Sequence, residues 1–170
     1  MASLMDELVG VLEEEIKAYE LLVATSKEKT DYIVKADIPK LEECTDREQE
    51  ITSKIKNLDN FRVDKTLEMA RVINRDPEEM TLTNLIAYLK NQPDEQRRLE
   101  DVRSRLVEVL TEMKRVNDQN GILIKQAMEM VEFDLTLFRS LRQAPETANY
   151  DKRAYNTGTL LGGGGFDASQ

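Results

Sequence analysis

Long stretches of this chain repeat an apolar side chain every three or four positions and contain almost no residue that interrupts a helix. This spacing places the apolar side chains on one face of an α-helix and does not suit the alternation of a β-strand. The four prolines, at positions 39, 77, 93 and 145, lie where these stretches begin or end, and five of the seven glycines lie in the last 13 residues. We therefore expect an all-α chain that ends in a glycine-rich segment.

The spacing predicts three long helices and one short helix. The first covers residues 4–35, with Ser3 as a candidate N-cap. The second begins after Asp37, which can cap its first turn, where Pro39 is tolerated. Its apolar residues recur at about 3.5 positions, the period of a coiled-coil seam, and Cys44 is expected to be a small buried side chain beside that seam. The short helix covers residues 82–89 and the longest covers residues 93–142.

The length of the last helix constrains the architecture. So long a helix with a polar outer face is not stable alone, and its main apolar stripe, from Leu99 to Leu141, is expected to pack on neighbouring helices. Short connections make those neighbours antiparallel. We expect an elongated antiparallel helical bundle over residues 1–142 and a flexible tail over residues 143–170. The four glycines at 162–165 lack the Lys-Ser/Thr that follows a phosphate-binding loop.

Composition argues against an enzyme. The chain has no histidine, which is the commonest general base and metal ligand, and its one cysteine cannot form an internal disulfide. A carboxylate site for Mg²⁺ would need acids on several helices, whereas Glu48 and Asp134 are the acids at seam positions and the run 13–15 is interpreted as a solvated face. We expect no catalytic residue, no metal and no cofactor.

Charge and hydropathy narrow the range of partners and locations. The formal charge of −9 does not suit binding to nucleic acid. No stretch approaches 18 uninterrupted apolar residues, and the first 20 residues lack the pattern of a signal peptide. We expect a cytoplasmic protein that does not insert into membranes.

The last helix becomes more apolar after residue 121. Twelve of the 20 residues from 122 to 141 are apolar, and a second stripe lies about 100° around the helix from the main one. The candidate partner-binding residues are those of this stripe and one side chain that widens the arc, namely Ile124, Met128, Val131, Leu135, Phe138 and Phe133. Either the short helix or a second copy of the chain covers them, or they bind an amphipathic helix of another protein, which suits adaptable methionines.

Two segments resemble the FlgN family of flagellar type III export chaperones. The second helix contains LEE at 41–43 and REQEI at 47–51, and the last helix contains NDQNGILI at 117–124, followed by an apolar helix and a tail with Tyr and Gly. The resemblance implies a chaperone that binds the C-terminal helical region of the hook–filament junction proteins FlgK and FlgL, prevents premature assembly and delivers them to the flagellar export apparatus. It also implies that the client binds to the C-terminal part, which here is the apolar region 122–141.

Asn117 and Asn120 match the family motif and also have a local interpretation. Asn120 lies on the main stripe, where one polar residue can fix the register of packed helices. Gly121 would permit a close helix approach or a bend. The main alternative to the chaperone is a general coiled-coil scaffold or adaptor, which would form a homo-oligomer through the same helices.

Overall fold

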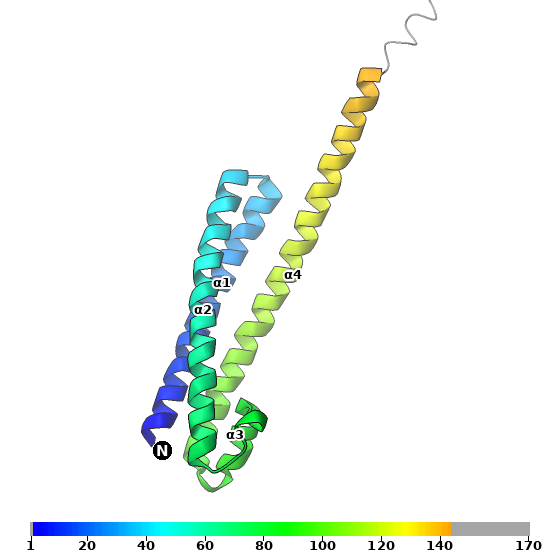
Figure 1. Cartoon of the computed structure of the whole chain (residues 1–170). Helices are drawn as coiled ribbons and strands as arrows, with labels where there is room; N and C mark the ends of the chain where they lie inside the picture. The colour runs from blue at the N-terminus through cyan, green and yellow to red at the C-terminus, as the bar shows by residue number, and fades with distance from the viewer. Residues whose placement is uncertain (1, 144–170) are drawn as a thin grey trace, which may run out of the picture. The chain divides into compact units, whose positions relative to one another are not determined.

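The structure, a computed structural model, describes residues 2–143, and all of its elements in that range are helical (Figure 1). The long helices are α1 (Ala2–Lys35), α2 (Ile38–Val72) and α4 (Pro93–Gln143). The short α3 (Leu82–Tyr88) lies between two 3₁₀ turns, η1 (Pro77–Glu79) and η2 (Leu89–Asn91). The prediction of an all-α protein with three long helices and one short helix is confirmed for these residues. The predicted cap at Ser3 is wrong, because Ser3 lies inside α1.

The connection between α1 and α2 follows from local chemistry. Ala36 takes a left-handed conformation, with φ 53°, and the amide of Asp37 donates to the carbonyl of Tyr32 at 3.0 Å, which ends α1. The Asp37 side chain then accepts from the amide of Lys40 at 3.2 Å and caps α2, as predicted. The same type of ending recurs after α2, where Asn74 has φ 56°. Both helices therefore stop at one left-handed residue.

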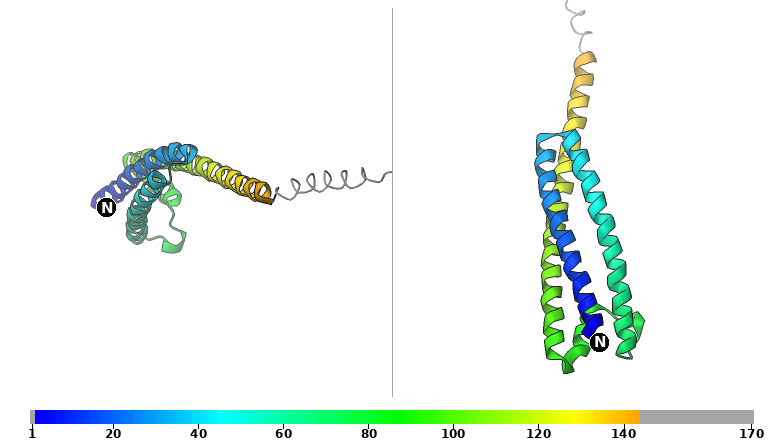
Figure 2. Two further views of the ribbon diagram at one scale, coloured as in Figure 1. Left: turned by 90° about the horizontal axis from the view of Figure 1, so that it is seen from above. Right: turned by 90° about the vertical axis from the view of Figure 1, so that its left-hand side faces the viewer.

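Charged pairs join α1 to α2, which lie side by side in Figures 1 and 2. Later residues of α1 pair with earlier residues of α2, so the two helices run in opposite directions. The nitrogen–oxygen distances are 2.7 Å for Lys65–Glu7, 3.1 Å for Arg62–Glu15, 2.6 Å for Arg47–Glu28 and 2.7 Å for Lys29–Glu48. The interpretation of Glu15 as part of a solvated face is wrong: its side chain is 3% exposed and bound by Arg62.

The main core combines all four α-helices. Apolar side chains from each of them form one buried cluster, whose largest fully buried members are Met5, Leu8, Leu12, Met69, Leu85 and Leu99. A smaller cluster between α1 and α2 contains Ala18, Ile51 and Ile55. Cys44 is fully buried, as predicted from its place in the α2 seam.

The chain divides into two units by its internal contacts, residues 1–124 and residues 125–170. Both core clusters belong to the first unit. The described part of the second unit is the last part of α4, residues 125–143. The predicted tail lies outside the described residues apart from position 143, so the expected domain boundary there stays a prediction. None of the described helices is both long and apolar enough to span a membrane.

Candidate partner-binding site

Eight large apolar side chains are exposed along the last part of α4, and we call them the α4 face. They are 47–69% exposed and comprise Met128, Met130, Val131, Phe133, Leu135, Leu137, Phe138 and Leu141. Five of the six candidate binding residues belong to this set. The sixth, Ile124, is the last residue of the first unit and is half-buried.

The main apolar stripe of α4 is not buried along its whole length, and this corrects our expectation. Leu99, Val102, Leu106 and Val116 are buried, whereas Met130, Leu137 and Leu141 of the same stripe are exposed. The buried residues of the stripe belong to the first unit and the exposed ones belong to the second.

The apolar residues of the short helix α3 pack within the first unit. Leu85 and Ile86 of α3 are buried in the main core cluster, together with Leu99 and Val102 of α4. The apolar side of α3 is thus used within the first unit, while Phe138 remains 69% exposed. The two coverings expected from the sequence, the short helix and a second copy of the chain, stay alternatives to a partner.

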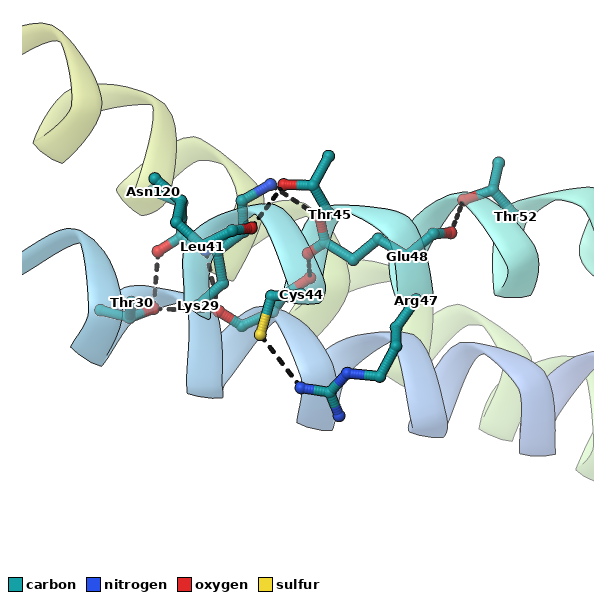
Figure 3. Close-up of polar contacts among 10 residues, drawn as sticks. Lys29, Thr30, Leu41, Cys44, Thr45, Arg47, Glu48, Thr52 and Asn120 are labelled. Carbon is teal, nitrogen blue, oxygen red and sulfur yellow. Dashed lines mark hydrogen bonds and ion pairs between the residues drawn. The ribbon is translucent and has the colours of Figure 1, made fainter. Parts of the chain in front are cut away.

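A buried polar group near the end of the first unit joins α4 to both other long helices (Figure 3). The Asn120 amide nitrogen donates to the carbonyl of Ser26 at 2.8 Å, and its amide oxygen accepts from the Thr30 hydroxyl at 2.6 Å. The Ser26 hydroxyl donates to Glu48 on α2 at 2.6 Å, and Lys29 binds the other carboxylate oxygen at 2.7 Å. We call Ser26, Lys29, Thr30, Glu48 and Asn120 the polar layer.

Asn120 makes the contacts expected of a residue that fixes the register of α4 against α1. Its side chain is 5% exposed, and both ends of its amide are hydrogen-bonded to α1. A shift of α4 by one residue would leave the buried Asn120 amide without these partners, which is costly. The register role itself stays a prediction.

The other two motif residues differ from Asn120. Asn117 is exposed and lines a cleft of about 310 Å³ together with Tyr19, Leu22 and Met113. A Cβ added at Gly121 would meet no atom within 4 Å, so Gly121 does not permit a close helix approach. The helix also continues through this position.

Two glutamates have shifted pKa values with opposite causes. Burial raises the pKa of Glu15, and the neighbouring Arg62 opposes this only in part. Hydrogen bonds from Arg115 and then Lys27 lower the pKa of Glu112 to about 2. The Lys27–Glu112 pair, at 3.0 Å, joins α1 to α4 within the first unit.

The groups considered for chemistry serve structural contacts. The sulfur of Cys44 accepts a hydrogen bond from Arg47 at 3.1 Å, and Glu48 belongs to the polar layer (Figure 3). Within residues 2–143, no three His, Cys, Asp or Glu side chains converge as a metal site would require. The α4 face stays the candidate binding surface, as a prediction.

Comparison with known protein families gives a match over most of the chain. The FlgN protein family matches residues 1–158, a range that includes the polar layer and the α4 face. The chain belongs to the FlgN family. The resemblance seen in the sequence is thereby confirmed, and because FlgN proteins are flagellar export chaperones, membership agrees with a protein that is not an enzyme. Comparisons with curated proteins and with solved structures gave no match.

Sequence reasoning missed most of the polar layer of this FlgN-family chain. The signal available in the sequence was that two hydroxyl side chains, Ser26 and Thr30, lie four positions apart in the apolar stripe of α1. Two hydroxyl side chains in one stripe require partners once they are buried. The sequence does not say that the Ser26 hydroxyl finds Glu48 on α2, or that the Thr30 hydroxyl finds Asn120, which lies 90 positions later.

Proposed function

We propose that this FlgN-family protein is a cytoplasmic chaperone of the hook–filament junction proteins FlgK and FlgL. It binds their C-terminal helical region through the α4 face, prevents premature assembly and delivers them to the flagellar type III export apparatus. The observation that supports this proposal is the exposure of eight large apolar side chains on one helix. Exposed apolar surfaces of this extent usually mark binding sites.

The physical basis is helix-to-helix recognition. An unassembled junction protein exposes an apolar helical side that would otherwise pair with its own kind. The α4 face offers that side an alternative surface, and a stable contact of this type buries about 1,200–2,000 Å² in total. Met128 and Met130 adapt their shape to different partners at little cost, which favours a contact that can be released at the export apparatus.

The first unit would supply the support for this surface. We propose that α1, α2 and the first part of α4 act as an elongated antiparallel bundle in solution. In this bundle, Asn120 fixes the register of α4 through Ser26 and Thr30. Asn117, which is exposed, is available for contact with the client. Client binding would then use a helix whose start is firmly placed.

The test of this proposal is a double substitution, Val131→Asp with Phe138→Asp. It places two charges in the α4 face, and we expect it to weaken binding of a FlgK or FlgL C-terminal fragment by at least about 100-fold, because both side chains lose their apolar contacts. Fluorescence anisotropy of the labelled fragment measures the binding, and circular dichroism checks that the helices remain.

The matched control makes the same chemical change on other helices. Leu21 on α1 and Phe61 on α2 are 57% and 58% exposed, so Leu21→Asp with Phe61→Asp should leave the affinity unchanged. Equal affinities for the two double variants would contradict the proposed site. If sedimentation equilibrium shows a dimer that only the Val131/Phe138 variant dissociates, and the fragment does not bind, the scaffold that dimerises through α4 is the correct function.

A further inference from the structure

One acidic side chain interrupts the α4 face. The residues three and four positions from Asp134 are all apolar: Met130, Val131, Leu137 and Phe138. Side chains at these spacings are neighbours on a helix surface, so the Asp134 carboxylate lies among four apolar groups. Asp134 and all four of these neighbours are exposed.

The described part of the chain does not neutralise this carboxylate. None of the ion pairs formed between residues 3 and 142 includes Asp134. Lys125 and Arg139 are near it in sequence, but at about 100° per residue they lie about 180° and 140° around the helix from it. Both bases therefore belong to the polar side of α4.

A partner that covers the α4 face also covers Asp134. If the partner were wholly apolar, the carboxylate would lose its water and gain nothing in exchange, which is strongly unfavourable. We infer that the helix bound by the α4 face carries an arginine or lysine within its own apolar side, placed opposite Asp134. This inference rests on the proposed function and specifies the chemistry of the client helix.

A second copy of this chain does not place an arginine or lysine opposite Asp134. In a parallel in-register pair, Asp134 would face Asp134, and like charges repel. In an antiparallel pair, the one described base on the same side is Arg142, eight positions later. Eight positions correspond to about 80° around the helix, so Arg142 does not lie in the same row of side chains as Asp134. An antiparallel pair therefore does not place a described base opposite Asp134 at the centre of the α4 face.

Arginine suits this position better than lysine. The guanidinium group can form two parallel hydrogen bonds with a carboxylate, and it is less strongly hydrated than an ammonium group. Its long apolar stem can also lie along Met130 and Leu137. A client helix with arginine at this point should therefore bind more tightly than one with lysine.

The experiment uses the full-length protein and three synthetic amphipathic peptides. The peptides are 20-residue helices with a leucine-rich side, identical except for arginine, leucine or glutamate at the centre of that side. Isothermal titration calorimetry at physiological salt measures their affinities. We expect the wild-type protein to bind the arginine peptide at least about tenfold more tightly than the glutamate peptide, because a desolvated charge pair of this kind discriminates strongly.

The decisive comparison is between two charge reversals on one helix. Asp134→Arg should reverse the preference between the arginine and glutamate peptides. Glu132→Arg makes the same change in net charge on an exposed residue about 160° around the helix, and it should keep the wild-type preference. Both residues are exposed on α4, so circular dichroism should be unchanged in both variants.

The outcomes separate this inference from the proposed function. Equal binding of the three peptides, or the same preference in both variants, would overturn the inference and leave the α4 face as a docking surface. If none of the peptides binds, both the inference and the docking role fail. Peptide binding that requires dissociation of a protein dimer, seen by sedimentation equilibrium, would overturn the inference in favour of a second copy.

Discussion

At the scale of single residues, burial rather than residue type decides what a polar side chain does. Glu13 and Glu15 are two positions apart and chemically identical, yet Glu15 is buried against Arg62 and Glu13 is exposed. Asn117 and Asn120 differ in the same way. Glu15 is held by Arg62 at 3.1 Å and Asn120 by two hydrogen bonds to α1, whereas the exposed Glu13 lies 3.9 Å from Arg105 of α4. The role of each buried member therefore depends on close contacts with residues far away in the sequence.

Asn120 and Asn117 provide a direct test of this difference. We expect Asn120→Ala to lower the free energy of unfolding by about 1–3 kcal/mol, because the buried carbonyl of Ser26 and the hydroxyl of Thr30 lose a partner. Asn117→Ala, on an exposed position of the same helix, should change it by less than about 0.5 kcal/mol. Urea denaturation measures both, and similar values would show that the polar layer does not hold α4.

At the scale of the helices, most ends follow from local sequence, and this is why they could be predicted. Asp37 and Pro39 form a start signal that needs no tertiary contact, and the structure has α2 begin there. Ser3 carries a similar signal, but the helix extends past it to Ala2. The left-handed Ala36 was not predictable, because alanine rarely adopts that conformation.

Gly121 gives a prediction at this scale. The helix continues through this position, and an added Cβ would meet no atom within 4 Å. Gly121→Ala should therefore raise the free energy of unfolding by about 0.5–1 kcal/mol, because alanine loses less backbone entropy in a helix than glycine does. Thermal denaturation by circular dichroism measures the change. A loss of stability would mean that α4 needs the freedom of glycine at this position.

At the scale of the whole molecule, the free energy of unfolding should depend on pH. Two glutamates contribute to this dependence with opposite signs. The pKa of Glu112 is about 2 in the folded protein, against 4.5 for an ordinary glutamate, so its stabilising effect is complete above pH 4.5 and is lost as the pH falls toward 2. The pKa of Glu15 is raised, so its protonation stabilises the folded protein as the pH falls toward 4.5 from above.

The pH prediction can be checked with one variant and one control. Glu112→Gln should flatten the loss of stability between pH 4.5 and pH 2, measured as the urea midpoint at each pH. Glu108→Gln, one turn earlier on an exposed position, should leave that loss unchanged. If Glu112→Gln behaves like the control, the pair with Lys27 does not contribute to holding α1 and α4 together.

The candidate site was predictable to the extent that it depends on one helix. Met128, Val131, Leu135 and Phe138 share a stripe because of helical spacing alone, so the sequence identified them before the structure showed their exposure. The polar layer joins residues about 90 positions apart, and no local pattern specifies such a pairing. Leu137 continues the main stripe of α4 but is exposed, and spacing within one helix does not reveal which part of a stripe is buried.

The core clusters of the first unit include none of the α4 face, and this has a consequence for how such proteins diverge. If the α4 face binds the client as proposed, a substitution at Phe133 or Phe138 changes recognition and leaves both core clusters as they are. The family could then adapt to changes in its client by altering the end of one helix. We expect sequence variation among orthologues to concentrate on that end and to track the variation of the client, while the interior around Leu8 and Leu99 changes slowly.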